Sequence, residues 1–279
     1  MNLSEIKIVA DSSADTLWLD GISFASAPLK IITKEKEYID DSDLDVCGMA
    51  DDLLCYNGKS STACPSPSDW LYSFGDAKYI FCLTITSTLS GSYNSAMIAK
   101  SDYEAQHLDR KVFVFDSLST GPEMRLIIEK IKALALQNKS YDDICQEIIA
   151  YSKKTGLIFM LESMKNLANN GRVSHIVAKA AGLLGIRVVG KASDRGDLEV
   201  LKNSRGEKKA LREIVGFMKS LGMSGGSVYI SHCCNEDAAN ALKALILEQF
   251  PDVKIEIYLA RGLVSFYAEK GGLLIGFEK

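Results

Sequence analysis

Long hydrophobic runs are missing from this sequence of 279 residues. No apolar stretch reaches the roughly 18 residues that a membrane-spanning helix requires, so we predict no membrane span. The first residues, MNLSEIKIVADSS, also lack the basic start and the small-residue cleavage site of a secretory signal. These two absences predict a cytoplasmic protein, and they leave room for a transient contact with a membrane surface.

An excess of positive charge is lacking too, because 32 Lys and Arg residues stand against 36 Asp and Glu residues. The net charge of −4 argues against a nucleic-acid-binding protein, which needs a basic face for phosphates. The seven cysteines form no C-x-x-C pair and are odd in number, so we expect neither a disulfide framework nor a zinc site. Metal binding by His232, Cys233 and Cys234 is conceivable, but we interpret them as buried strand-end residues.

Nucleotide-binding and catalytic motifs are absent as well. The sequence has no G-x-x-x-x-G-K-[ST] and no G-x-G-x-x-G after a strand, so we predict no bound nucleotide and no cofactor. Its three histidines do not suggest a catalytic triad. The letters G-x-S-x-G at 222–226 imitate a nucleophile elbow, but a predicted helix precedes them and a predicted strand follows. That order is reversed, so we interpret 222–226 as a helix-to-strand connection.

The composition that is present, 47% apolar and 24% charged residues, is typical of a globular protein. In the first half, apolar strands at 6–10, 79–83 and 112–115 alternate with helices, which predicts βαβ units on a parallel sheet. The length favours two domains rather than one. We predict an α/β protein with domains 1–158 and 159–279.

The second half shows a different pattern. A helix is expected over 174–184, and strands at 186–189 and 198–202 are separated by GKASDRGD, which is typical of a hairpin connection. This half is therefore predicted to be α/β with a mixed sheet. In the first half, the acidic residues at 40–45 are expected to cap the helix that follows them.

The stretch that follows the strand at 79–83 is unusually rich in hydroxyl groups. Six Ser and Thr side chains lie within residues 84–92, directly before a predicted helix. Ligands bind beyond the carboxyl ends of strands in open α/β sheets, and backbone amides with hydroxyls suit a carboxylate or phosphate. Plain helix capping needs only one hydroxyl, so we favour a binding site here.

Two strand-end carboxylates leave an enzymatic alternative open. Asp11 and Asp116 each follow an apolar strand, as an aspartyl phosphotransferase or a hydrolase would require. Asp11 and Asp15, however, are four residues apart, whereas known sites of this kind, such as the haloacid dehalogenases, space their acids by two. We therefore keep a phosphotransferase or hydrolase as an alternative to the binding site described above.

Six motifs in fixed order resemble the DegV family, the fatty-acid-binding subunits of bacterial fatty acid kinase. They cover nearly the whole chain, and their order is more specific than any one of them alone. The motifs are VADSSADT (9–16), TACPSPSD (62–69), ITSTLSGSYNSA (85–96), VFDSLSTG (114–121), LESMKNLANNGRVS (161–174) and ISHCCNEDAANALK (230–243).

The resemblance implies a two-domain DegV-like fold that holds one long-chain fatty acid in an interdomain tunnel. The family's carboxylate-binding positions fall here on Thr62, Ser90 and Arg172. A fourth position, commonly His in the family, is Tyr267, which can donate a hydrogen bond but cannot carry the positive charge of His. Ala63 and Cys64 also stand where the family more often has Ser and Gln.

By the same resemblance, the chain is a lipid-binding subunit without catalytic machinery of its own. It would present the carboxylate to a separate ATP-dependent kinase, which forms the acyl phosphate. Arg205, Lys208 and Lys209 could dock that partner, although a solvated helix face is the simpler interpretation of them. The remaining alternatives are the phosphotransferase or hydrolase and a lipid-sensing regulator that uses the same pocket.

Overall fold

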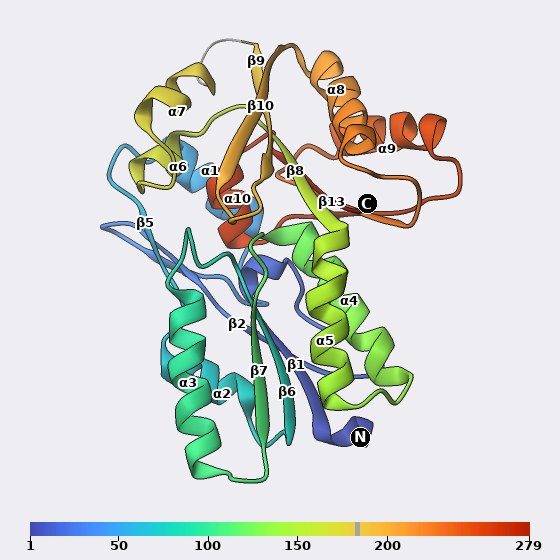
Figure 1. Ribbon diagram of the computed structural model, residues 1–279. Helices are drawn as coiled ribbons and strands as arrows, with labels where there is room; N and C mark the ends of the chain where they lie inside the picture. Colours follow the sequence, from blue (N-terminus) through green and yellow to red (C-terminus); the bar gives the residue numbers. More distant parts are fainter. Residues whose placement is uncertain (182–184) are drawn as a thin grey trace.

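The computed structural model describes residues 1–181 and 185–279 and shows two α/β halves stacked on one another (Figure 1). The lower half in this view contains a sheet of four strands in the order β2-β1-β6-β7. All three strand pairs are parallel, as predicted from the alternation of strands and helices. The strands are β1 (Ile6–Asp11), β2 (Ser23–Ala27), β6 (Tyr79–Thr84) and β7 (Lys111–Asp116).

Helices cover both faces of this parallel sheet, which explains why its strands are nearly continuous apolar runs. Alternate residues of β1 point to opposite faces. Ile8 packs in one buried cluster with Met124 and Ile127, whereas Val9 packs in another with Trp70. The helices of the two faces are α2 (Pro67–Phe74) with α3 (Ser92–Gln106), and α4 (Gly121–Leu136) with α5 (Tyr141–Tyr151).

The upper half contains a mixed sheet of six strands in the order β10-β9-β8-β13-β11-β12. β11 and β12 run parallel, and the other pairs are antiparallel, so the prediction of a mixed sheet is confirmed. The expected hairpin joins β9 to β10. The strands are β8 (Thr155–Leu161), β9 (Ile186–Ala192), β10 (Leu198–Arg205), β11 (Ser227–His232), β12 (Lys254–Leu259) and β13 (Leu273–Glu278).

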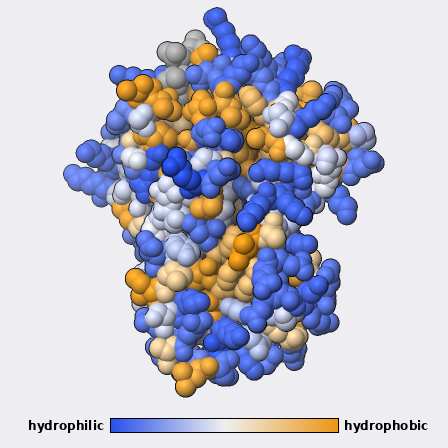
Figure 2. All heavy atoms as spheres, viewed as in Figure 1, coloured by the Kyte–Doolittle hydropathy of each residue, from blue (hydrophilic) through white to orange (hydrophobic). Residues whose placement is uncertain are grey.

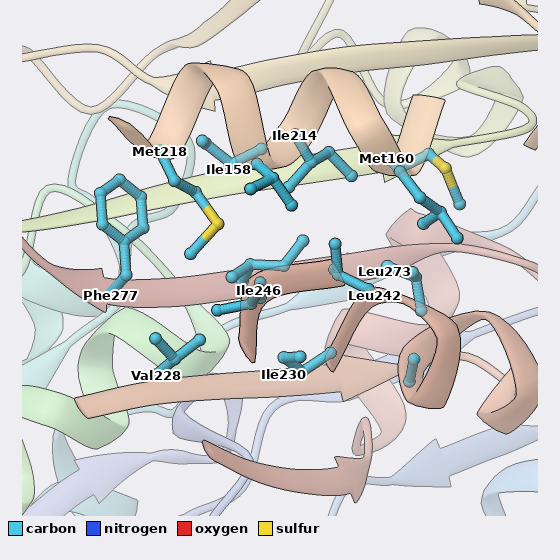
Figure 3. Close-up of a cluster of buried hydrophobic side chains, with 14 of the residues drawn as sticks. Ile158, Met160, Ile214, Met218, Val228, Ile230, Leu242, Ile246, Leu273 and Phe277 are labelled. Carbon is cyan, nitrogen blue, oxygen red and sulfur yellow. The ribbon is translucent and has the colours of Figure 1, made fainter. Parts of the chain in front are cut away.

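One face of the mixed sheet is covered by α8 (Glu207–Ser220) and α9 (Glu236–Gln249). Figure 3 shows Ile214 and Met218 of α8 above Ile158 of β8, with Ile246 of α9 among the same side chains. Burial of each such side chain contributes about 1.5–3 kcal/mol, so this cluster supports the sheet firmly from one side. The opposite face packs against Leu167, Val264 and Ala268 of the same half and also meets the lower half.

Helix α4 fills part of that opposite face and joins the two halves. It packs against β13 and β11 as well as against the parallel sheet (Figure 1). Gly276 of β13 allows the close approach, because a Cβ there would lie 2.4 Å from the carbonyl carbon of Pro122 and 2.5 Å from the amide nitrogen of Glu123. The two halves therefore share a packed backbone contact.

Further elements surround the junction of the halves. Helix α10 packs against α1 and β3, which both come from the first part of the chain. A small antiparallel sheet has the strand order β4-β3-β5. These elements are β3 (Lys30–Ile32), β4 (Glu37–Ile39), β5 (Ser61–Ala63), α1 (Val46–Cys55), α6 (Lys165–Asn169), α7 (His175–Ala181), α10 (Gly262–Ala268) and the 3₁₀ turns η1 (Leu3–Glu5), η2 (Ser12–Ala14) and η3 (Ser152–Lys154).

The fold differs from the expectations in a few places. The sequence pattern did not predict β4, β5 or α10. The helix expected over 174–184 is observed as α7, and its residues 182–184 lie outside the described residues. A domain boundary at residue 158 would cut β8, which lies wholly in the mixed sheet. A division just before Thr155 fits the topology better, and the division itself stays a prediction.

The expected helix cap and the expected connection are both confirmed. Asp45 precedes α1 and its Oδ1 accepts a hydrogen bond of 3.0 Å from the amide of Gly48. The connection at 222–226 lies between α8 and β11, so no nucleophile elbow forms. Across the parts of the chain that the structure describes, no helix is both long enough and apolar enough to cross a bilayer.

Candidate functional site

A largely apolar cavity lies between the two halves. It encloses about 810 Å³ of empty space, its open mouth included. The turn after β6 and the loop before α4 supply walls from the lower half, and β8, the β9–β10 hairpin and α10 supply walls from the upper half. Figure 2 shows orange, apolar residues in the surface at the waist between the halves. The apolar lining includes Leu157, Phe159, Leu161, Leu198, Leu263 and Leu274.

A small group of polar side chains lines the same cavity. Thr62 on β5 and Tyr267 on α10 are hydrogen-bonded through their hydroxyl oxygens at 2.7 Å. The two residues come from opposite ends of the chain, so their contact depends on the packing of α10 against the small sheet. Burial raises the pKa of Tyr267, although the Thr62 hydrogen bond and the charge of Arg172 oppose that shift. Tyr267 therefore stays a neutral phenol.

Arg172 supplies the positive charge at this polar group. Its guanidinium carbon lies 5.8 Å from the centre of the Tyr267 ring. Its Nε donates to the carbonyl oxygen of Leu89 at 3.2 Å, and Nη1 donates to the carbonyl oxygen of Asn170 at 2.5 Å. These two bonds fix the plane of the guanidinium and leave Nη2 available for a ligand, since a guanidinium has five N–H donors.

Ser90 lies beside Arg172 at the tip of the turn that follows β6. Its hydroxyl oxygen accepts a hydrogen bond of 3.2 Å from the amide of Ser92, which leaves the Ser90 proton free to be donated. The Ser90 side chain is therefore held by a backbone amide and still has a proton to donate. The structure thus brings all four predicted residues, Thr62, Ser90, Arg172 and Tyr267, to the wall of one cavity.

Two other hydroxyls of the turn hold neighbouring segments in place. The Ser92 hydroxyl donates at 2.6 Å to the carboxylate of Asp11, and the Thr88 hydroxyl donates at 2.7 Å to the carbonyl oxygen of Arg195 in the β9–β10 hairpin. Gly196 at the hairpin tip meets the turn so closely that a Cβ would lie 2.0 Å from the Thr86 hydroxyl oxygen. The hairpin therefore covers the cavity and is anchored on the turn.

The strand-end carboxylates are held by backbone amides and hydroxyls of the surrounding loops. Asp11 is fully buried and accepts hydrogen bonds from the amide of Ile85 and the hydroxyls of Ser13 and Ser92. Asp116 accepts hydrogen bonds of 3.0–3.3 Å from the amides of Ser87 and Leu118. These bonds hold the loops that follow β6 and β7. Neither side chain lines the cavity, and the phosphotransferase or hydrolase alternative is not favoured.

Two other buried carboxylates position α10. The Oδ1 of Asp15 accepts a hydrogen bond of 2.7 Å from the amide of Arg261, and Asp40 accepts bonds of 2.8 Å from the amides of Gly262 and Leu263. Burial raises the pKa of both carboxyls, and the amide bonds oppose the shift. These contacts satisfy the free amides at the start of the helix that carries Tyr267.

Other candidate residues lie outside the cavity. Arg205, Lys208 and Lys209 are exposed where β10 leads into α8. His232 and Cys233 are buried at the end of β11, as expected, and burial lowers the pKa of His232. Cys234 was also expected to be buried, but it is exposed. In residues 1–181 and 185–279, no group of three or more His, Cys, Asp or Glu side chains is placed to hold a metal ion.

Much of the cavity wall could not be recognised in the sequence. Leu29, Ser119 and Thr120 line it from loops of the lower half, and Phe159 lines it from β8. The strand residues have the alternating pattern of an ordinary core, and the loop residues form no motif. Only the run of hydroxyls at 84–92 gave a local signal for this place.

Known proteins resemble this chain over nearly its whole length. The family model described as an uncharacterised protein of the DegV family matches residues 5–279. A DegV domain-containing protein of Streptococcus pneumoniae is 42% identical over 98% of both chains.

Two solved structures are also similar over nearly their whole length. A DegV family protein from Eubacterium eligens, loaded with heptadecanoic acid, has a TM-score of 0.97 and 42% identity, covering 98% of this chain and 99% of that one. The fatty acid kinase (Fak) B3 protein of Streptococcus pneumoniae, loaded with linoleic acid, has a TM-score of 0.96 with the same identity and coverage.

Proposed function

The chain belongs to the DegV family, and from this premise we propose that it binds one long-chain fatty acid in the cavity between its halves. The single observation that carries the proposal is the geometry of that cavity, which joins an apolar channel to a cluster of donors with one positive charge. An apolar tail with an acidic end is the ligand that such a cavity suits. Similar proteins solved with heptadecanoic, linoleic and vaccenic acids support this class of ligand.

The apolar wall would supply most of the binding free energy. At about 0.8 kcal/mol for each buried methylene, a tail of about fourteen methylenes contributes roughly 11 kcal/mol before the entropic cost of association is subtracted. An unpaired carboxylate in such a channel would be strongly unfavourable or would take up a proton. The polar residues are therefore needed to hold the charged end in one place.

We assign the carboxylate to Thr62, Ser90, Arg172 and Tyr267. Arg172 supports this assignment because its Nε and Nη1 groups donate to backbone carbonyl oxygens. These two bonds orient the guanidinium and with it the remaining Nη2 group. Ser90 and the Thr62–Tyr267 pair each keep one hydroxyl proton for an oxygen of the ligand. A carboxylate accepts several such bonds at once.

The chemical step would belong to a partner, as in the fatty acid kinase whose B3 protein is similar to this chain. The chain would hold the carboxylate at the mouth of the cavity, and an ATP-dependent kinase subunit would phosphorylate it. Such presentation fixes the orientation of the reacting group, which is itself a large catalytic advantage. We propose the exposed residues Arg205, Lys208 and Lys209 as part of the docking surface for an acidic region of that subunit.

The test is native mass spectrometry of the purified full chain, followed by lipid extraction. We expect the mass of the chain plus one fatty acid, or the same complex after incubation with heptadecanoic acid. Failure to bind any fatty acid in both experiments would contradict the proposal. Hydrolysis of phosphate esters by the isolated chain with a divalent cation would instead favour the enzymatic alternative.

A second experiment tests presentation. With ATP and a fatty acid kinase catalytic subunit, the loaded chain should yield acyl phosphate, and the loaded chain with ATP alone should yield none. The double substitution of Lys208→Glu and Lys209→Glu should slow this reaction and leave fatty acid binding unchanged. If the double variant reacts at the normal rate, the proposed docking surface is wrong.

A further inference from the structure

Two exposed cysteines from distant parts of the chain lie against each other. Cys47 is in the first turn of α1, and Cys234 follows the last residues of β11. Their sulfur atoms are 3.2 Å apart, although the residues are separated by 187 positions in the sequence. A disulfide bond requires about 2.05 Å between sulfur atoms, so the two sulfur atoms would have to approach by about 1 Å to form one.

The pair connects a helix that packs against α10 with a loop bonded to the turn after α10. Helix α1 packs against α10, and in Figure 1 the blue α1 lies beside the red α10 in the upper half. The loop that contains Cys234 is bonded to the turn after α10, because Cys233 donates to Gly272 and accepts from Gly271 through backbone groups at 2.9 Å. A bond between Cys47 and Cys234 would therefore join α1 to the segment that ends α10.

We propose that Cys47 and Cys234 are a thiol pair that a hydroperoxide oxidises to a disulfide, and that this bond slows the exchange of the ligand in the cavity. The second part rests on the proposed fatty acid binding. The cross-link would restrain the end of α10 that is opposite to the end held by Asp15 and Asp40. Leu263, Val264 and Tyr267 of α10 line the cavity, so restraint of α10 restrains its wall.

The chemistry proceeds in two balanced steps. One thiolate attacks hydrogen peroxide, which is reduced to water, and the sulfur becomes a sulfenic acid. The second thiol then attacks that sulfur, and a second molecule of water leaves as the S–S bond forms. Partial burial of the thiol and the neighbouring Cys47 raise the pKa of Cys234 to about 11, so little of its thiolate is present at pH 7 and the reaction should become faster as the pH rises from 7 to 9.

Other cysteines provide clear contrasts. Cys233 is adjacent to Cys234 but is buried at the end of β11, and burial raises the pKa of its thiol. Cys55 is exposed at the other end of the same helix as Cys47. Cys55→Ser is therefore a matched control that removes an exposed thiol from α1 and leaves the proposed pair intact.

The experiment treats the reduced full chain with hydrogen peroxide and measures its mass and its cross-linked peptides. We expect a loss of about two mass units, the mass of two hydrogens, and one peptide pair that contains Cys47 and Cys234. Cys55→Ser should behave in the same way, whereas Cys47→Ser and Cys234→Ser should form no such link. A bond between Cys233 and Cys234, bonds between two chains, or sulfinic acid at Cys47 would each overturn the inference.

Two further measurements test the consequence. Closing so long a loop should raise the midpoint of thermal unfolding by about 5 °C in the oxidised protein, and reduction should reverse the change. Exchange of bound heptadecanoic acid into lipid vesicles should become severalfold slower on oxidation, but only when both cysteines are present. A disulfide without slower exchange would overturn the second part, whereas a disulfide in a protein that binds no fatty acid would count against the proposed function alone.

Discussion

Two hydroxyl groups share one hydrogen bond at the polar end of the cavity, and this sharing limits what each can give to a ligand. Thr62 and Tyr267 have two hydroxyl protons between them, and one is used in their 2.7 Å contact. The other proton remains for a carboxylate oxygen, whichever residue donates it. With the phenol neutral, Arg172 is the side chain of this group that can balance a negative charge.

Replacement of Arg172 should therefore weaken fatty acid binding more than any other single change at the polar end. For Arg172→Ala we expect a loss of about 2 kcal/mol or more, or at least thirtyfold in Kd, because the carboxylate keeps its burial and loses its countercharge. For Ser90→Ala we expect about 1–3 kcal/mol if its bond to the ligand is buried. Titration calorimetry with heptadecanoic acid measures both.

The control is Arg212→Ala, which removes an exposed guanidinium from α8 and should leave the Kd unchanged. Thermal unfolding of each ligand-free variant shows whether the fold is intact. Wild-type affinity in both Arg172→Ala and Ser90→Ala would mean that the carboxylate lies elsewhere in the cavity.

The buried carboxylate of Asp11 makes a second prediction at the scale of single residues. Burial raises the pKa of Asp11 to about 6, in spite of the hydrogen bonds from Ser13, Ser92 and Ile85. Because the folded pKa exceeds the unfolded value of 3.8, the folded state binds the proton more tightly. The contribution of Asp11 to stability is therefore greatest below about pH 4 and is lost as the pH rises through 6.

Relative to Asp11→Asn, the free energy of unfolding of the wild type should fall by roughly 2–3 kcal/mol between pH 4 and pH 7. Urea unfolding at several pH values measures this difference. Asp20→Asn, at an exposed carboxylate, should reproduce the wild-type dependence on pH. A constant difference between wild type and Asp11→Asn across this range would contradict the predicted shift.

At the scale of helices and strands, elements with long apolar runs were predictable. Short elements that depend on contacts with distant parts of the chain were not. The strands predicted at 6–10, 79–83, 112–115, 186–189 and 198–202 are observed close to those positions as β1, β6, β7, β9 and β10. Helix α10 has only seven residues and is buried on nearly all sides, so it shows no amphipathic period. The carboxylates at its start, Asp15 and Asp40, are more than 200 residues away in the sequence.

The same reasoning explains what could be foreseen of the site. The run of hydroxyls at 84–92 pointed to a binding site at this turn, and the family resemblance then singled out Ser90 within it. Thr62 on the three-residue β5, and Tyr267 on α10, could be named only through the family resemblance, because their contact exists only in the folded chain. Their role as carboxylate ligands stays a prediction until a ligand is bound.

The contact between α4 and β13 gives a prediction at this scale. For Gly276→Ala we expect destabilisation by about 1–3 kcal/mol or more, because the new Cβ would overlap the backbone of Pro122 and Glu123 at 2.4–2.5 Å and rigid backbone cannot move aside easily. Chemical unfolding measures the loss.

The matched control is Gly216→Ala in α8, where a Cβ would meet no atom within 4 Å. There we expect a gain of about 0.5–1 kcal/mol, since Ala favours a helix interior over Gly. Equal effects at the two positions would show that the close approach at Gly276 does not limit the packing of the two halves.

At the scale of the whole molecule, the cavity has walls from both halves, so a bound ligand adds contacts that neither half makes alone. The shared helix α4, the amide bonds from α10 to Asp15 and Asp40, and the hairpin anchored on the turn after β6 hold the halves together without it. The confirmed DegV-like fold accounts for this arrangement. The ligand would fill the apolar space between these three connections.

Removal of the ligand should therefore lower the stability of the entire chain in one transition. A fatty acid present at a hundred times its Kd stabilises the folded state by about 2.7 kcal/mol, which corresponds to a shift of roughly 5 °C in the unfolding midpoint. Calorimetry on extracted protein, before and after addition of heptadecanoic acid, measures this shift. Arg172→Ala should need a much higher concentration of the acid for the same shift, because its affinity is lower. An unchanged midpoint in the wild type, or two transitions of which only one responds, would mean that the ligand does not bridge the halves.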